Sequence, residues 1–395
     1  MNPVEHIRHW HAEYTGLRRD LHAHPELGFE EERTARIVCE QLRRLGIEHH
    51  AGIGRTGVVA VIRGRDGAGS VGLRADMDAL PMQEENEFPH RSRYDGRMHG
   101  CGHDGHTTML LAAARYLAET RNFTGTVNLI FQPGEEGFAG AREMIEDGLF
   151  ERFPCEQVFA LHNWPALPVG KIGLTPGAAL AAADRVEITI DGRGGHGAHP
   201  HRTVDPVVVA GHIITAVQSI VSRNVSPIDT AVVSLCSMHA GNPGAMSVVP
   251  QHAKLVGTVR TFKPTVQNTV EQRLKELVGS IGAAFGAQAT VHYERIYPAT
   301  INHDGPSAFA LDVAESLVGR ENVVRNLDPS MGSEDFSFML QVKPGAFARL
   351  GQGGADAGSF LHATRYDFND AVIPLGAGYL AALTERALPI VRPAP

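Results

Sequence analysis

The sequence predicts an α/β domain that is interrupted by an inserted ferredoxin-like domain. Over the first 183 residues, apolar runs typical of buried strands alternate with helix-like segments, which predicts a sheet covered by helices on both faces. Residues 184–297 instead follow the order β-α-β-β-α-β, which is the ferredoxin-like pattern. At 395 residues the chain is also too long for one ordinary core. We therefore expect one domain from residues 1–183 and 298–395, and a second from residues 184–297.

The elements of the split domain follow from the spacing of its apolar residues. Residues 31–45 carry apolar side chains at helical spacing, and Gly46 is well placed to end that helix. A second helix is expected at 107–119, which is rich in alanine and leucine and contains no Gly or Pro. Strands are expected at residues 57–64, 70–78, 126–133 and 155–163, and further helices at 307–319 and 376–388.

The inserted segment has a pattern of its own. Alternating or apolar runs predict strands at residues 185–192, 230–240, 253–262 and 288–297. Two helices, expected at 203–223 and 265–286, connect the first strand to the second and the third strand to the fourth. This order is the basis for expecting a compact inserted domain.

The composition indicates a globular protein and excludes several partners. Hydrophobic residues make up 43% of the chain and charged residues 20%, the usual balance for a globular fold. A net charge of -8 without a long basic run gives nucleic acid no electrostatic footprint. The start lacks a signal-peptide pattern and no stretch is expected to reach transmembrane length, so we expect a cytoplasmic protein that binds no membrane. Four widely scattered cysteines argue against a disulfide framework.

The stretch MHGCGHDGH, residues 98–106, brings three histidines, one cysteine and one aspartate together between glycines. Glycine-rich backbone can turn Cys101 and His103 toward one point, and the stretch leads directly into an expected helix. A Cys-x-His pair alone is a weak signal, because Asp104 can cap that helix while the histidines stay in solvent. The pair becomes a stronger signal for a metal site because other polar residues are expected at the same edge of the sheet.

Polar side chains follow the predicted strands at their carboxyl ends, where ligands collect in an open α/β sheet. They are Asp76, Asp78, Glu135, Glu136, His162 and Asn163, and the later run GSFLH adds His362. Together with Cys101 and His103 they offer thiolate, imidazole and carboxylate groups. That mixture suits zinc, manganese or cobalt better than calcium or magnesium, which prefer oxygen ligands. The sequence therefore predicts a transition-metal site at this rim of the sheet.

Glu135 and Glu136 are expected in an extended segment, where neighbouring side chains point to opposite sides. One carboxylate could then bind metal while the other faces the substrate as a general base, and the spacing leaves open which does which. Plainer interpretations exist, an exposed acidic pair for the glutamates and a core histidine for His162. His106 is expected to support its loop. Surface or turn positions are expected for His22, His24, His49, His50, His199 and His201.

Eight motifs occur in an order that resembles a known family. They are DLHAHPELGFEE, LRADMDALPM, MHGCGHDGHTTMLL, FQPGEEG, ALHNWP, GGHGAHPH, MGSEDFSF and LHATRYDFND. The set resembles the bacterial hippurate hydrolase and N-acyl-amino-acid amidohydrolase family, which is related to plant auxin-conjugate hydrolases. The resemblance extends from about residue 15 to residue 385. Such an ordered series is specific for the family and much less so for one substrate.

The resemblance implies a split catalytic domain with a mixed sheet flanked by helices, and an inserted domain that acts as lid and dimerisation domain. It also implies two divalent metal ions per subunit, Mn, Zn or Co, which share a bridging water. The implied metal ligands are Cys101, His103, Glu136, His162 and His362. Glu135 is implied as the general base that takes a proton from this water. Asp78 is implied as a carboxylate near the metals, although Asp76 is equally near in sequence.

Residues of the inserted segment are implied to act on the substrate. His196, in GGHGAHPH, matches the family histidine that reaches the other subunit of a homodimer and donates to the oxyanion. Arg260, on a predicted strand, is suited to bidentate capture of a carboxylate, or else to a surface salt bridge. Ser247 stands where relatives have a substrate-contacting asparagine. Thr364 stands where they have a proline, which leaves the loop after the last ligand less constrained.

We therefore expect a metal-dependent amidohydrolase that cleaves the amide of N-acyl or N-aroyl amino acids, such as hippurate-like conjugates, into a carboxylic acid and an amino acid. A dipeptidase or carboxypeptidase with the same metal chemistry is the first alternative. A thiol hydrolase, with Cys101 as nucleophile and His103 or His106 as base, leaves most of the polar groups at the rim unused. A non-catalytic metal-binding scaffold has no use for an unliganded base.

Overall fold

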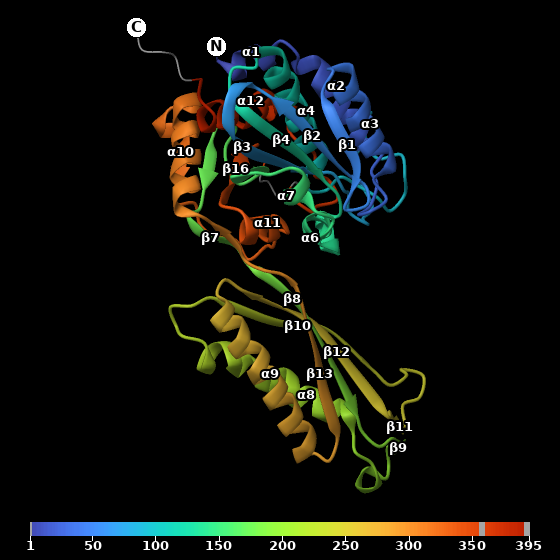
Figure 1. The fold of residues 1–395 in the computed structure, drawn as a ribbon. Helices are drawn as coiled ribbons and strands as arrows, with labels where there is room; N and C mark the ends of the chain where they lie inside the picture. Colours follow the sequence, from blue (N-terminus) through green and yellow to red (C-terminus); the bar gives the residue numbers. More distant parts are fainter. Residues whose placement is uncertain (1, 355–359, 391–395) are drawn as a thin grey trace. The chain divides into compact units, whose positions relative to one another are not determined.

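The computed structural model describes residues 2–354 and 360–390, and the described chain divides into two compact units (Figure 1). The first unit contains the residues up to Ala179, residues 301–329 and the residues from Asp335 onward. The second unit contains residues 180–300 and a short return, residues 330–334. Each unit has a hydrophobic core of its own.

The first unit is built on an eight-stranded sheet with the order β1-β2-β4-β3-β5-β16-β6-β15. β3 runs parallel to β4 and β5, and β5 runs parallel to β16, whereas β2 pairs antiparallel with β4. The expected mixed sheet is therefore confirmed. The strands are β1 (Glu48–Ile53), β2 (Gly57–Arg63), β3 (Arg65–Asp76), β4 (Thr124–Gln132), β5 (Gln157–Trp164), β6 (Ile172–Leu174), β15 (Val323–Arg325) and β16 (Gly345–Gly351).

Helices flank this sheet, and α4 lies at the centre of the helical packing. α4 contacts both α2 and α12, and its side chains are buried on nearly every side, as its alanine- and leucine-rich sequence predicts. The helices are α1 (Pro3–Arg8), α2 (His11–His22), α3 (Glu32–Arg44), α4 (His103–Thr120), α5 (Glu135–Phe138), α6 (Gly140–Glu146), α7 (Leu149–Arg152), α10 (Asp304–Val318), α11 (Phe336–Val342) and α12 (Ile373–Ala387).

The parallel strands at the middle of the sheet place three chain segments at one rim. β3 ends at Asp76, β4 ends at Gln132 and β5 ends at Trp164. Because parallel strands present their carboxyl ends on the same side, the residues at and after these ends lie together. α4 begins at this rim as well, since its first residues contact the ends of β3 and β5.

The second unit is a four-stranded antiparallel sheet with the order β10-β12-β8-β13, packed against two helices. The observed sequence of strands and helices is β-α-β-β-α-β, so the ferredoxin-like pattern is confirmed. A separate two-stranded pair joins β9 (Gly195–His196) to β11 (Val248–Val249). The main elements are β8 (Ala182–Asp191), α8 (Pro206–Ser219), β10 (Ala231–Ala240), β12 (His252–Thr261), α9 (Pro264–Ala284) and β13 (Gln288–Tyr297).

One helical segment contradicts the expectation that no stretch reaches transmembrane length. α8 and the following π-helical turn, residues Pro206–Asn224, form 19 residues with a mean hydropathy of 1.3. The segment packs on the core of the second unit through Val209, Ile213 and Val217. Because a core helix of a globular domain has the same length and composition, the segment is weak evidence for a membrane span.

His22 is fully buried, so its predicted surface position is wrong. Its Nδ1 lies 2.8 Å from Oδ2 of Asp104, in the first turn of α4, and its Nε2 lies 3.3 Å from Oε1 of Glu84. Burial alone would lower the pKa of His22, but the two carboxylates outweigh burial and raise it to about 9. Asp104 consequently binds His22 and does not cap α4.

Arg18 completes this buried polar network beside α4. Its side chain is fully buried and pairs with three carboxylates, at 3.4 Å from Asp104, 2.9 Å from Asp367 and 2.7 Å from Asp370. Removing one partner of a buried ion-pair network is costly, because the desolvated charges that remain lose part of their compensation. Arg18 therefore holds α2, α4 and the segment before α12 together.

We predict that Arg18→Met lowers the free energy of unfolding by about 3–5 kcal/mol, because it removes the buried guanidinium that pairs with Asp104, Asp367 and Asp370. The neighbouring Arg19→Met is the matched control, since Arg19 also pairs with Asp370 but its side chain is 50% exposed. We expect the control to lose less than about 1 kcal/mol. Urea unfolding followed by circular dichroism measures both values, and equal losses would contradict the role of Arg18.

Candidate metal centre

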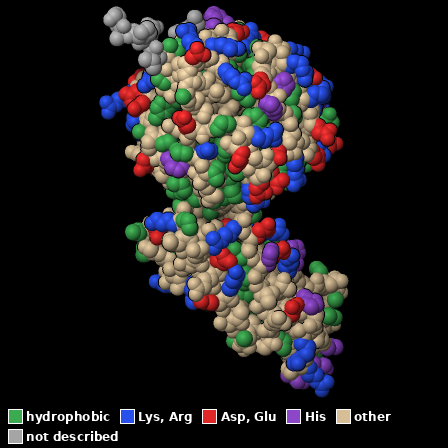
Figure 2. Space-filling model, in the orientation of Figure 1, with side chains coloured by type: hydrophobic (Ala, Val, Ile, Leu, Met, Phe, Trp, Pro, Cys, Tyr) green, Lys and Arg blue, Asp and Glu red, His purple; other side chains and the backbone are tan. Residues whose placement is uncertain are grey.

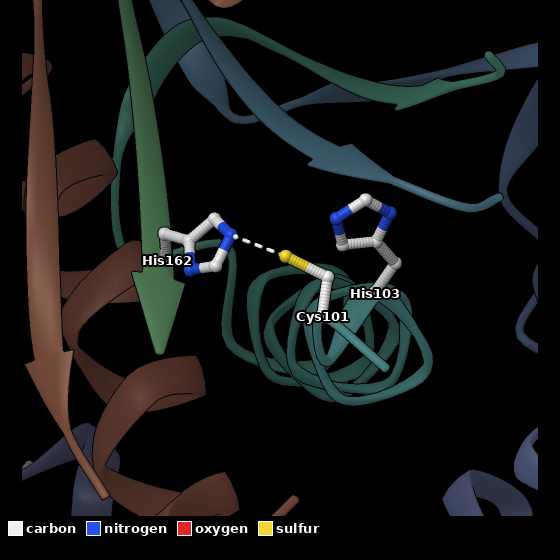
Figure 3. A group of neighbouring side chains, drawn as sticks. All are labelled: Cys101, His103 and His162. Carbon is white, nitrogen blue, oxygen red and sulfur yellow. Dashed lines mark hydrogen bonds between the residues drawn. The ribbon is translucent and has the colours of Figure 1, made fainter. Parts of the chain in front are cut away.

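The loop that precedes α4 turns at Gly102, which has a left-handed backbone (φ 95°). A Cβ at this position would lie 2.3 Å from Oδ1 of Asn163 and 2.5 Å from the hydroxyl of Tyr366, so only glycine fits. The turn sets Cys101 and His103 on either side of it at the amino end of α4 (Figure 3). The sequence expectation of a turn that brings both side chains to one point is thus met locally.

His162, near the carboxyl end of β5, points at Cys101 (Figure 3). Its Nε2 lies 3.5 Å from Sγ of Cys101, while its Nδ1 lies 2.7 Å from the carbonyl oxygen of Asn163. The ligand atoms of Cys101, His103 and His162 all lie within 4.8 Å of one another. These three buried residues form one group that could hold a metal ion.

A second group shares Cys101 and adds Glu136 and His362. Nε2 of His362 lies 3.3 Å from Oε1 of Glu136, and that oxygen lies 3.9 Å from Nε2 of His103. All five predicted ligands therefore come together, although they originate from four separate parts of the sequence. Of the run GSFLH that led to His362, Gly358 and Ser359 lie outside the described residues.

The loop after His362 is tied down at the position where relatives have a proline. The hydroxyl of Thr364 donates to Oε2 of Glu85 at 3.0 Å, and the carbonyl of Thr364 accepts from the Glu85 amide at 2.8 Å. These two hydrogen bonds supply a constraint that the missing proline would otherwise give.

Asp78 contacts two of the predicted ligands at once. Its Oδ1 lies 3.2 Å from Nδ1 of His103, and its Oδ2 accepts from the backbone amide of Glu136 at 2.9 Å. A carboxylate on Nδ1 fixes the orientation of the imidazole and directs Nε2 toward the site. Asp76 hydrogen-bonds mainly to a different histidine, since its Oδ1 lies 2.5 Å from Nδ1 of His106, while its Oδ2 lies 3.6 Å from Nε2 of His103. The two aspartates are equally near in sequence, but only Asp78 contacts Nδ1 of His103 among the described residues.

Glu135 and Glu136 do not lie in an extended segment, so that expectation is wrong. Gly134 has a left-handed backbone (φ 57°), and the chain then enters the short helical turn α5. Glu136 departs from helical geometry within this turn (ψ 73°), which separates the directions of the two side chains. Glu135 is 6% exposed, and its Oε1 accepts from the backbone amide of Asp335 at 3.3 Å.

The electrostatics of the site favour positive charge. Burial lowers the pKa of His162 well below its usual value. For His103 burial acts in the same direction, but Asp76 and Asp78 outweigh it and raise the pKa well above its usual value. The Cys101 sulfur and the Glu136 carboxylate, which accept from the protonated imidazole, raise the pKa of His362 to about 10. Protons on His103 and His362 stabilise the same negative charge that metal ions would stabilise.

Two buried atoms test whether the site fits a metal. Within the part of the chain that the structure describes, neither Nε2 of His103 nor Oε1 of Glu136, both buried, makes a well-aligned hydrogen bond, although Oε1 forms an ion-pair contact with Nε2 of His362 at 3.3 Å. Buried polar atoms are nearly always paired, and both of these are predicted ligand atoms. The donor set of one thiol, three imidazoles and carboxylate oxygen matches transition-metal preferences. The residues therefore fit the group that the sequence predicts.

Several residues at the rim were not among the site residues predicted from the sequence. Arg74, Gln132 and Asp335 form a buried polar network directly beneath the predicted ligands. The position of Arg74 inside the apolar run of β3 is a signal that could have identified it as a buried, functional arginine. His106 bridges Asp76 and Asn163, with its Nε2 2.6 Å from Oδ1 of Asn163, which agrees with its predicted supporting position.

The predicted site residues of the second unit have different surroundings. His196 is exposed on β9, and its Nδ1 accepts from the Ala198 amide at 3.1 Å. Figure 2 shows histidine and basic side chains gathered at the end of this unit where β9 and β11 lie in Figure 1. The carbonyl of Ser247, next to β11, accepts from the Gly197 amide at 2.7 Å. His199 and His201 are also exposed, as predicted.

Arg260 is half-buried on β12 and makes no surface salt bridge among the described residues. Its Nε donates to the hydroxyl of Thr258 at 3.2 Å and its Nη1 donates to the hydroxyl of Ser333 at 2.9 Å. Burial lowers the pKa of Arg260. The guanidinium borders a cavity of about 340 Å³ within the second unit, which leaves it suited to a ligand anion.

We predict that Asp78→Asn weakens the affinity for Mn²⁺, Zn²⁺ or Co²⁺ by about 10–100-fold, because it removes the charge that orients His103 and supports Glu136. Competition with a chelating dye measures the dissociation constants. Asp95→Asn, at an exposed loop position, is the control and should leave them unchanged. An unaltered affinity in the Asp78 variant would contradict its supporting role.

Comparison with known proteins identifies the family. The model of peptidase family M20/M25/M40 matches residues 72–386. Hippurate hydrolase from Campylobacter jejuni is 41% identical over 388 residues, and the alignment covers 98% of this chain and 100% of that protein. N-acetylcysteine deacetylase from Bacillus subtilis is 37% identical over 389 residues, and the alignment covers 97% of this chain and 99% of that protein. The solved structure of the YXEP protein from Bacillus subtilis, described as a dinuclear metal-binding peptidase of the M20 family, matches with a TM-score of 0.83 at 33% identity, covering 97% of this chain and 100% of that one. The chain therefore belongs to peptidase family M20/M25/M40, and the resemblance found in its motifs is confirmed.

Proposed function

We propose that the protein is a metal-dependent amidohydrolase that cleaves N-acyl or N-aroyl amino acids into a carboxylic acid and an amino acid. The observation that carries this proposal is a buried carboxylate, Glu135, beside five side chains suited to transition metals, two of which present buried ligand atoms without a well-aligned hydrogen bond. The names of the relatives, hippurate hydrolase and N-acetylcysteine deacetylase, support an N-acylated amino acid as the substrate.

The proposal includes two divalent ions per subunit, Mn, Zn or Co. The five residues that would hold them are Cys101, His103, Glu136, His162 and His362, which form two overlapping groups around Cys101. When bound, such ions lower the pKa of water and polarise the scissile carbonyl. Asp78 keeps His103 in the tautomer that leaves Nε2 for coordination.

Glu135 is the proposed general base. It takes a proton from the attacking water and returns it to the amide nitrogen, so that the C–N bond breaks and the amine leaves neutral. The hydrogen bond from the Asp335 amide fixes one of its carboxylate oxygens. Its burial excludes bulk water from this proton transfer.

Two other enzyme classes are less well supported. A dipeptidase or carboxypeptidase would use the same centre on a different substrate. A thiol hydrolase would use Cys101, whose sulfur faces His162, but burial lowers the pKa of His162, and its Nδ1 lies against the backbone carbonyl of Asn163 rather than a carboxylate. A thiol mechanism also assigns no role to the carboxylates of Glu135 and Glu136.

We predict that Glu135→Gln lowers kcat/KM for hippurate by about 10²–10⁴-fold, because the amide cannot accept the proton. Turnover of hippurate and related conjugates by the metal-loaded protein, followed by liquid chromatography, measures the loss. Metal content serves as the control and should stay equal in both proteins. Full activity of the variant with metal bound would refute Glu135 as the base.

The second unit is proposed to recognise the substrate and to form a homodimer. Arg260 would bind the substrate carboxylate, Ser247 would contact the substrate, and His196 would donate to the oxyanion in the partner subunit. The exposure of His196 and the cavity beside Arg260 support these roles. Sedimentation in solution tests the dimer, and a monomer at assay concentrations would contradict it.

We predict that Arg260→Gln raises KM about 10–100-fold for substrates with a free carboxylate, since it removes a charged hydrogen-bond donor. The same variant should leave kcat/KM unchanged for the corresponding amide-capped substrates. Arg185→Gln, which alters an exposed arginine bordering the same cavity, provides the control. Equal losses on both kinds of substrate would exclude carboxylate recognition by Arg260.

A further inference from the structure

Arg74 lies on β3, 3% exposed, beneath the predicted metal ligands. Its Nη1 donates to Oδ2 of Asp76 at 2.8 Å, and its Nη2 donates to Oδ1 of Asp335 at 3.0 Å. Its Nε donates to Oε1 of Gln132 at 2.8 Å. One buried cation thus connects the residue that ends β3 to the residue that precedes α11. A buried guanidinium with this many partners is held in a single orientation.

Asp335 receives donors on both of its carboxylate oxygens. Besides Arg74, Nε2 of Gln132 donates to Oδ1 at 2.7 Å and lies 2.9 Å from Oδ2, and the backbone amide of Ala141 donates to Oδ2 at 2.9 Å. Ala141 lies in the first turn of α6, where a carboxylate is favourable for the helix dipole. The side chain is therefore anchored by a cation, an amide and a helix terminus.

The backbone of the same residue holds the proposed base. The amide of Asp335 donates to Oε1 of Glu135 at 3.3 Å. The side chain of Asp335 accepts from the amide of Ala141, which lies six residues after Glu135 in the sequence. One residue, 200 positions away in sequence, thus binds the Glu135 carboxylate through its amide and the first turn of α6 through its side chain. A carboxylate without the amide contact would be freer to shift.

We propose that Asp335 is a positioning residue for Glu135: its carboxylate, anchored by Arg74, Gln132 and Ala141, fixes the amide that orients the base. The inference rests on the proposed role of Glu135 and adds a residue to it. Misplacement of a catalytic group by about 1 Å can cost about 100-fold in rate, because the reacting atoms no longer meet in line. The hydrogen bond of the Asp335 amide goes to the proposed base, so we expect Asp335 to act on the base rather than on metal binding.

The test is a double-mutant cycle between Asp335→Ala and Glu135→Gln in the metal-loaded full chain. Alone, Asp335→Ala should lower kcat on hippurate about 10–100-fold and change KM less than about 3-fold. In the Glu135→Gln background it should lower the residual rate less than about 2-fold, because the group that it positions is already gone. Equal losses in both backgrounds would show a general structural defect and overturn the proposal.

Two further variants keep the test decisive if Asp335→Ala misfolds. Gln132→Met removes the side-chain donor to Asp335 at similar volume, and should show the same dependence on Glu135 with a smaller loss. Asn128→Ala removes a buried amide earlier on β4 that binds the carbonyl of Pro154, far from Glu135 along the strand, and its loss should be equal in both backgrounds. If Asp335→Ala does not fold, Gln132→Met replaces it in the cycle.

The result also separates this proposal from the function on which it rests. A wild-type protein without amidase activity, or a fully active Glu135→Gln variant, contradicts the proposed function. An active wild type with an inactive Glu135→Gln variant and an unimpaired Asp335→Ala variant contradicts only the positioning role. Metal content measured in every variant should remain equal, and a lower content in Asp335→Ala would overturn the claim that the residue acts on the base.

Discussion

The rim of the central sheet buries several carboxylates in a small volume, and their neutralisation is the constraint on which the site depends. Asp76, Asp78 and Glu135 are almost fully buried. An unpaired charge in such a buried position costs on the order of several kcal/mol. Arg74 neutralises Asp76 and Asp335 from beneath, and His103 and His106 pair with the aspartates from the side of α4. A divalent cation bound at this rim would pair with the remaining buried ligand atoms of His103 and Glu136.

This arrangement explains why the ligands come from distant parts of the sequence. The parallel strands deliver Asp76 and His162 to one rim, and a glycine turn starts α4 at the same point. The polar groups beneath and beside the ligands fix their orientations, as hydrogen-bonded carboxylates do at metal sites in general. Rigid strands and a buried network therefore prepare the site before any metal or substrate binds.

The sequence predicted most of the architecture and the five proposed metal ligands that the structure brings to one rim, but it could not predict their local surroundings. Strand ends and glycine-rich turns are local signals, so Cys101 and His162 could be placed at a common rim. The surroundings of His22 depend on Asp104 and Glu84, which are distant in sequence, so its burial left no local signal. The turn at Glu135 depends on the left-handed Gly134, whose conformation a strand-like pattern conceals. Asp335 was recognisable only as part of a family motif, because its contacts cross 200 residues.

The most direct test of the central claim is a titration of metal-free protein with Mn²⁺ while hippurate hydrolysis is followed. The account predicts no turnover after chelation and full recovery at two ions per chain. It also predicts that iodoacetamide leaves the metal-loaded enzyme active, because the bound metal shields the sulfur of Cys101 from alkylation. Turnover that persists in chelator, with no metal in the protein, and that iodoacetamide abolishes would contradict it.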